Sequence, residues 1–155
     1  MANKICAELF IHIVFAVKGR QCFIPRQSRV VLEKYMTAVL QNDGHKLLSI
    51  YCMPDHTHLL AGLNPDISIS DMVQDVKRAS TNFINDKKIM VPHFNWQKGF
   101  GAFSYSTEDV PGLIDDILHQ ELVHKSKTFR EEYIELLKIF DIEYDEKYLF
   151  DWIEE

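Results

Sequence analysis

The 155-residue sequence has only three cysteines, five prolines and six glycines, and it has no repeats or low-complexity segments. No apolar run approaches the roughly 20 residues that a membrane-spanning helix needs. The cysteines, at 6, 22 and 52, are widely spaced without a Cys-x-x-Cys pair, and with no recognisable signal peptide they favour the reducing cytoplasm. With 46 % hydrophobic and 26 % charged residues, the composition predicts one globular domain that buries its core without disulfides.

An excess of positive charge, common in nucleic-acid-binding proteins, is also missing, because the net charge is −6. The charge is unevenly distributed. Residues 131–155 carry ten acids and two bases, a balance of −8, whereas residues 1–130 have a balance of +2. The acidity is therefore C-terminal, and a DNA-binding face on the remainder is allowed but not indicated.

The apolar pattern predicts four strands and four helices. Residues 5–17 are apolar on both faces, which is typical of a central strand, and residues 45–53 and 56–63 predict a hairpin around Pro54-Asp55. The loop 92–106 leads into the fourth strand. In this order the elements predict an α+β fold, a ferredoxin-like antiparallel sheet with helices packed on it.

The helices are expected after Pro25 to about Asn42, from a cap at Ser68 or Ser70, from Asp109 to about Lys125, and from Thr128 to near Phe140. Thr128-Phe129-Arg130-Glu131 forms a capping box. The apolar side of the first helix is assigned to Val31, Tyr35, Ala38 and Val39. The acidic tail 142–152 holds enough aromatic side chains to predict packing on the body or on a partner.

The segment Met53-Pro54-Asp55-His56-Thr57-His58-Leu59-Leu60 carries the strongest chemical signal. Residues two apart in a strand project from one face, so His56 and His58 present two imidazoles suited to a divalent metal. The alternative is a turn-capping histidine beside a satisfied polar one, since isolated His-x-His pairs arise by chance. On the third helix, Asp116 and Gln120 share a face, although the polar residues there (His119, His124, Asp115, Glu121) taken alone suggest a solvated surface.

Three ordered stretches together resemble the HUH motif and flanking motifs of single-strand transposases of the insertion-sequence 200/605 family, of the single-tyrosine, REP-associated-like type. These stretches are Met53–Leu60, Trp96–Ser104 and Ile142–Leu149, and the resemblance runs from Phe10 to Tyr148. It implies an HUH transposase fold over residues 1–155, with an acidic C-terminal helix and tail from about residue 128. It also implies a homodimer that binds DNA hairpins and cuts and rejoins single-stranded DNA through a 5′-phosphotyrosine, with Mg²⁺ or Mn²⁺.

By the same resemblance, His56, His58 and Gln120 are the metal ligands, and the family's Tyr-x-x-x-Gln reads Asp116-x-x-x-Gln120. A carboxylate cannot replace the phenol, because the acyl phosphate it would form is labile. Pro111 and Gly112, and Val123-His124 in place of paired histidines, are further departures from the family pattern. The expectation is an intact metal side with cleavage reduced or lost.

Several alternatives stay open. Tyr105 is a weaker candidate for the nucleophile and Tyr133 a weaker one still. Asp116 could instead join the metal ligands and activate water, which would make the chain a metal-dependent nicking phosphodiesterase. A non-catalytic DNA-hairpin-binding or regulatory protein is the third possibility. Phosphate contacts are expected from basic residues of the less acidic part, for which a solubilising role is the alternative: Lys18, Arg20, Arg26, Arg29, Lys77 and Arg78.

Overall fold

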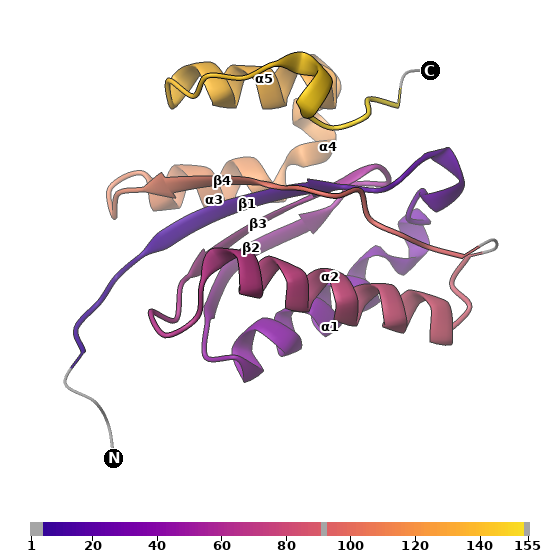
Figure 1. Cartoon of the computed structure of the whole chain (residues 1–155), viewed down its shortest axis with the longest axis horizontal. Coiled ribbons are helices and arrows are strands. Elements are labelled where there is room, and N and C mark those ends of the chain that lie inside the picture. Colours follow the sequence, from indigo (N-terminus) through magenta and orange to yellow (C-terminus); the bar gives the residue numbers. More distant parts are fainter. Residues whose placement is uncertain (1–4, 91–92, 154–155) are drawn as a thin grey trace.

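The computed structural model describes residues 5–90 and 93–153. Within these residues the chain forms one antiparallel sheet in the order β2-β3-β1-β4 (Figure 1). Its strands are β1 (Phe10–Ala16), β2 (Lys46–Cys52), β3 (His56–Gly62) and β4 (Gly101–Tyr105). This order and the alternation with helices confirm the predicted ferredoxin-like α+β class. Pro92, in the predicted loop before β4, lies outside the described residues.

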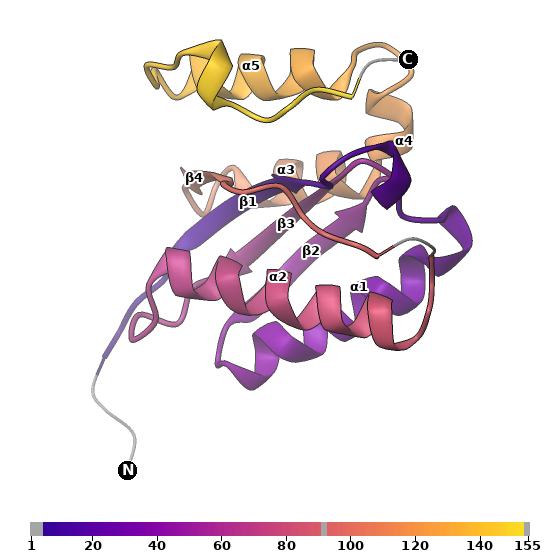
Figure 2. The same cartoon turned by 45° about the vertical axis from the view of Figure 1, so that its right-hand side comes forward.

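Helices cover both faces of the sheet (Figures 1 and 2). One face carries α1 (Arg29–Asn42) and α2 (Ile69–Asp86), and the other carries α3 (Val110–Leu118), α4 (Gln120–Val123) and α5 (Phe129–Ile139). Short 3₁₀ turns occur at Arg20–Cys22, Arg26–Ser28 and Glu146–Tyr148. All seven residues of β1 are buried, as expected for a central strand. Among the described helices, none has the length and apolarity needed to cross a membrane.

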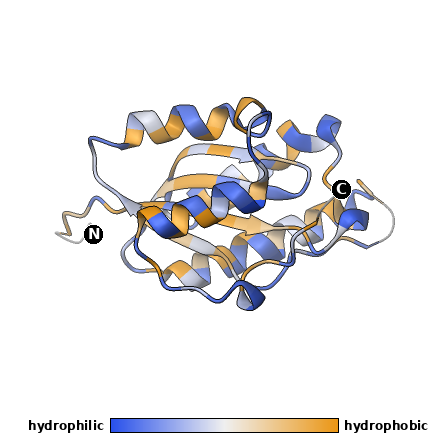
Figure 3. Cartoon of the chain, turned by 90° about the horizontal axis from the view of Figure 1, so that it is seen from above, coloured by the Kyte–Doolittle hydropathy of each residue, from blue (hydrophilic) through white to orange (hydrophobic). Residues whose placement is uncertain are grey.

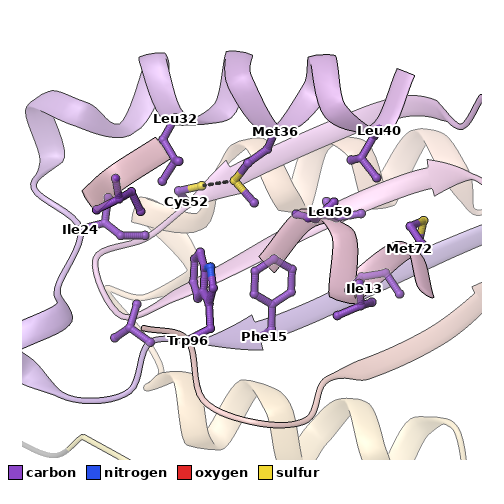
Figure 4. Packing of buried hydrophobic residues seen from close by; sticks show 14 of the residues in the cluster. Ile13, Phe15, Ile24, Leu32, Met36, Leu40, Cys52, Leu59, Met72 and Trp96 are labelled. Atoms are coloured by element: carbon purple, nitrogen blue, oxygen red, sulfur yellow. Dashed lines mark hydrogen bonds between the residues drawn. The ribbon is translucent and has the colours of Figure 1, made fainter. Parts of the chain in front are cut away.

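The larger core lies between the sheet and the α1–α2 layer (Figure 4). Phe15 of β1 is fully buried, and its ring meets that of Trp96 edge to face at a centroid distance of 4.7 Å. The Trp96 indole donates a hydrogen bond to Ser80 Oγ of α2 at 2.9 Å, which satisfies its one polar atom. This packing fixes β1 and β3, and therefore fixes the side chains that project from their opposite face.

The predicted inner face of α1 is wrong by one position along the helix. The buried residues are Leu32, Met36 and Leu40, while Val31 is 49 % exposed. The helix has apolar residues of its own on several sides, so the periodicity of the sequence alone does not select which line of side chains is buried. The i, i+4, i+8 line is the one that faces the sheet.

The predicted helix from Asp109 to about Lys125 is interrupted. It breaks at His119, whose backbone (φ −107°, ψ 32°) leaves helical geometry between α3 and α4. Asp109 does not cap it through its side chain, which instead accepts a hydrogen bond from Ser106 Oγ. Because the chain changes direction here, Gln120 points inward and is 2 % exposed.

The capping box of α5 is present as predicted: Thr128 Oγ1 accepts from Glu131 N, and a Glu131 carboxylate oxygen accepts from Thr128 N. Figure 3 shows hydrophobic and hydrophilic residues alternating along the helices. In α5 the apolar side holds Phe129 and Tyr133, which pack against Phe150 of the tail. The expectation that the tail packs on the body is met by its end, while Tyr148 remains 79 % exposed.

Thr128→Ala is expected to lower the free energy of unfolding by about 1 kcal/mol, because the backbone N–H of Glu131 at the start of α5 loses its side-chain acceptor. Urea denaturation followed by circular dichroism measures the change. Thr107→Ala, in an exposed turn, is the control and should change stability by less than about 0.5 kcal/mol. Equal effects of the two substitutions would contradict a role for the cap.

Candidate metal and DNA site

His56 and His58 project from β3 toward the face covered by α3, α4 and α5. Both imidazoles are buried, each 1 % exposed, and their ring centroids are 5.0 Å apart. Gln120, the distant amide expected beside them, is there: its Oε1 lies 3.4 Å from His56 Nε2. The structure therefore brings together the three side chains that the sequence predicted as metal ligands, all from one chain.

Two further donors join them. His124 Nε2 lies 3.2 Å from His56 Nε2 and 2.9 Å from Gln120 Oε1. Glu132 Oε1 lies 2.8 Å from His58 Nε2, 3.4 Å from His124 Nε2 and 3.8 Å from His56 Nε2. The ligand atoms of the three histidines and Glu132 all lie within 4.8 Å of one another. Three imidazole nitrogens and two side-chain oxygens thus converge on one small volume.

The other ring nitrogen of each histidine has its own partner. His56 Nδ1 donates to Asp55 Oδ1 at 2.6 Å, and His124 Nδ1 donates to the carbonyl of Lys127 at 3.0 Å. His58 Nδ1 lies 2.8 Å from Nε2 of His12, a buried neighbour on β1 whose ring stacks on it. Such outer partners orient metal-binding imidazoles, so the donor set fits a divalent cation.

The charges and pKa shifts of these side chains also suit a bound divalent cation. Burial alone would raise the pKa of Glu132, but the facing imidazoles of His58, His124 and His56 hold it well below its usual range, so it stays a carboxylate. Burial lowers the pKa of His56 despite the neighbouring Asp55, which keeps this imidazole neutral and able to donate a lone pair. Burial by itself would lower the pKa of His124, but the hydrogen bond and negative charge of Glu132 outweigh burial, so the pKa is raised.

His124 and Glu132 escaped sequence reasoning for different reasons. His124 is placed on a solvated helix face by periodicity, but the break at His119 turns α4 inward. Glu132 lies on a helix for which only the bounds and the capping box were predicted, and the turn after His124 brings the start of that helix against the N-terminal end of β3. The one available signal was the capping box, which fixes the start of α5 and sets Glu132 one turn from it.

Asp116, at the position of the family tyrosine, is exposed on α3. Its backbone carbonyl accepts a hydrogen bond from Gln120 Nε2 at 3.3 Å. Its carboxylate is not part of the converging group, which includes only Glu132 among the carboxylates of the described chain. The idea that Asp116 is an additional metal ligand therefore has no support in this geometry.

The tyrosines considered as alternative nucleophiles are held protonated. Burial, with the charges of Asp116 and Asp109, raises the pKa of Tyr105 to about 12. Burial likewise raises the pKa of Tyr133 to about 12. An activated nucleophile needs the opposite shift. Tyr51, not considered from the sequence, lies opposite His58 in the sheet register and donates to Glu121 at 3.3 Å.

Several of the predicted DNA-contacting residues have partners within the protein. Lys77 donates to the carbonyls of Gln97 and Gly99 and so holds the loop before β4 in place. Arg29 pairs with Glu33 and lies over the Tyr51 ring. Arg78 pairs with Asp75 on α2. Lys18 and Arg20 are exposed in the connection that follows β1.

Arg26, which pairs with Glu121, lines a cleft of about 700 Å³ that opens beside His56 and His124. The same cleft is lined by three bases that sequence reasoning missed, and by aromatic and apolar side chains. The bases are Lys125, Lys127 and Arg130, and the apolar lining includes Phe23, Met53, Phe129, Trp152 and Ile153.

Comparisons with known proteins agree with this geometry. Residues 6–120 match the family model described as "Transposase IS200 like". The ISDra2 transposase TnpA of Deinococcus radiodurans is 29 % identical over 73 residues, which are 47 % of this chain and 52 % of that protein. The chain therefore spans about half the length of this curated relative.

Two solved structures share the fold. One, from a protein assigned as a transposase in Deinococcus radiodurans R1, has a TM-score of 0.60 at 22 % identity and covers 77 % of this chain and 95 % of its own. The other, a REP-associated tyrosine transposase bound to a REP hairpin, has a TM-score of 0.59 at 16 % identity and covers 80 % and 74 %. Since the family model matches about three quarters of the sequence, the chain belongs to the IS200-like transposases.

Proposed function

We propose that this chain is a metal-dependent DNA-hairpin-binding protein of the transposase family, in which the tyrosine route of single-strand cleavage is lost or severely reduced. One observation carries the proposal: the imidazoles of His56 and His58 and the amide of Gln120 converge, while the position four residues before Gln120 holds Asp116. The side chains proposed to bind the metal are all present, whereas the tyrosine that would attack the phosphate is replaced by Asp116.

His56, His58 and Gln120 would hold the cation, Mg²⁺ or Mn²⁺ in the family. When bound, a divalent cation supplies Lewis-acid polarisation of the scissile phosphate. Asp55 keeps the His56 Nε2 lone pair directed inward, and Gln120 is held by hydrogen bonds from its Nε2 to the Asp116 carbonyl and the Glu132 carboxylate. These contacts would keep His56 and Gln120 oriented toward the cation whether or not a nucleophile is present.

The cleft beside His56 is the proposed path for single-stranded DNA. Lys125 and Arg26 supply positive charge for phosphates along its wall, and Phe23 and Trp152 supply ring surfaces suited to bases. A fold relative binds a REP hairpin. Lys18, Arg20 and Arg78 are proposed to contact the flanking duplex, while Lys77 and Arg29 act mainly within the protein.

The C-terminal helix and tail from about residue 128 are proposed as part of the same domain, because Glu132 reaches the histidine cluster. We also propose a homodimer, although the converging donors all come from one chain and need no second subunit. The cytoplasm is the proposed location.

The protein is expected to bind a hairpin oligonucleotide in Mn²⁺ but to form no covalent product that survives denaturation. Gel shift measures binding, and denaturing electrophoresis measures adducts and nicks. Hairpin binding that is unaffected by His56→Ala, with no nick, would favour the non-catalytic binding protein. A nick with a free 5′-phosphate and no adduct would favour the water-using phosphodiesterase. An adduct in the unaltered protein, mapped by mass spectrometry to Tyr51 or Tyr105, would overturn the loss of the tyrosine route.

A further inference from the structure

We infer that the segment 120–132 completes the metal centre with His124 and Glu132, and that the resulting set of three imidazoles, the Glu132 carboxylate and the Gln120 amide selects Zn²⁺ over Mg²⁺. The inference deepens the proposed function, because it concerns the same site and specifies the class of cation. His124 and Glu132 both lie beyond residues 6–120, the part that matches the transposase family.

His124 and Glu132 each place a ligand atom as close to a strand histidine as Gln120 does. His124 Nε2 is 3.2 Å from His56 Nε2, and Glu132 Oε1 is 2.8 Å from His58 Nε2. His124 and Glu132 are themselves largely buried, with side chains 11 % and 13 % exposed. Neither is a solvated surface group that happens to lie nearby.

The hydrogen bonds of His56 and His124 determine where their lone pairs point. His56 and His124 each donate through Nδ1, so in its neutral form each directs an Nε2 lone pair toward the other and toward Gln120 Oε1, at 2.9–3.4 Å. Acceptors this close repel unless a proton or a cation lies among them. A bound cation accepts all of these lone pairs and offsets the buried charge of Glu132 at the same time.

The ligand chemistry of this donor set favours Zn²⁺. Imidazole nitrogens suit Zn²⁺, whereas Mg²⁺ prefers an octahedron of oxygens and keeps several waters. With three nitrogens and side-chain oxygens only from Glu132 and Gln120, the site offers too few oxygens for tight Mg²⁺ binding. It resembles in composition the histidine–carboxylate sets that hold zinc.

Helix α5 and the turn before it pack directly against the histidine cluster. Phe129, the first residue of this helix, stacks face to face on the His56 ring with a centroid distance of 3.8 Å and an interplanar angle of 6°. The carbonyl of Lys127 orients His124, and the Thr128 cap starts the helix one turn before Glu132. The helix that supplies Glu132 is thus built against the cluster.

The test uses the full chain, freed of metal by chelation, with ZnCl₂, MnCl₂ and MgCl₂ titrated separately by calorimetry. Zn²⁺ is expected to bind at least about 100-fold more tightly than Mg²⁺. Glu132→Gln and His124→Ala should each weaken Zn²⁺ binding by about 10- to 100-fold or more. Glu135→Gln, exposed on the same helix, and His93→Ala, exposed and hydrogen-bonded to Asn85 of α2, are matched controls and should bind as the unaltered protein does. The visible spectrum of bound Co²⁺ reports the ligand set independently.

The outcomes separate this inference from the proposed function. If His56→Ala abolishes Zn²⁺ binding while Glu132→Gln and His124→Ala leave it unchanged, the inference fails and the proposed metal site stands. Equal affinity for Mg²⁺ and Zn²⁺ also overturns it. If none of the cations binds the unaltered protein, both proposals fail and the cluster is a proton-linked network of hydrogen bonds. Unaltered folding of each variant is checked by circular dichroism.

Discussion

Asp116→Tyr is expected to turn a protein that forms no covalent DNA product into one that forms a denaturation-resistant adduct with a hairpin oligonucleotide in Mn²⁺. The substitution restores a phenol four residues before Gln120, across the break at His119, and the Gln120 amide is already hydrogen-bonded to the carbonyl of residue 116. Because residue 116 is exposed, a larger side chain fits without repacking the core. Labelled oligonucleotide and denaturing electrophoresis measure the adduct.

Asp115→Tyr is the matched control, since the neighbouring residue is equally exposed but not four residues before Gln120. It should give no adduct. If Asp116→Tyr also gives none while hairpin and metal still bind, more of the centre has been lost than the nucleophile. Equal adducts from both variants would mean that any exposed phenol near the cleft suffices, which contradicts a specific nucleophile position.

His56→Ala is expected to abolish divalent-metal binding altogether. His56 contacts Asp55, Gln120 and His124 at once, and its fully buried ring stacks on Phe129. A cation at 100 times its dissociation constant stabilises a protein by about 2.7 kcal/mol. The metal-dependent rise in melting temperature should therefore vanish in this variant.

Thermal unfolding with and without MnCl₂ measures that loss, and His93→Ala, at an exposed histidine that contacts Asn85 of α2, serves as the control. The alanine is also expected to lower the metal-free stability, because a buried ring is removed. The decisive quantity is therefore the difference between the two conditions for each variant. A full metal-dependent shift in His56→Ala would contradict the assigned ligand.

Local patterns predicted most of the fold. The two-sided apolar run of β1, the Pro54-Asp55 turn and the Thr128 cap each determine the local backbone through short-range interactions, and each is present. The inner face of α1 and the break at His119 were not predicted. Both depend on which surface a helix meets, which is a tertiary property that periodicity cannot supply.

The residues of the candidate site likewise include some that were predicted and some that depend on tertiary structure. The two strand histidines follow from the two-residue period of a strand, and Gln120 follows from the family resemblance. His124 and Glu132 come together only because the chain turns twice, at His119 and after His124, and returns to the N-terminal end of β3. Charge alone does not give the surroundings of the basic residues: Arg29 and Lys77 were predicted to contact DNA, and in the structure both also have partners within the protein.

Anomalous diffraction from crystals grown with MnCl₂ is the most direct test of the central claim, that one cation is held by side chains from β3 and the segment after α3. The predicted result is one strong peak within bonding distance of His56 Nε2 and His58 Nε2, with Gln120 Oε1 facing it. Peaks only elsewhere in the crystal, or an empty cluster at saturating Mn²⁺, would contradict it.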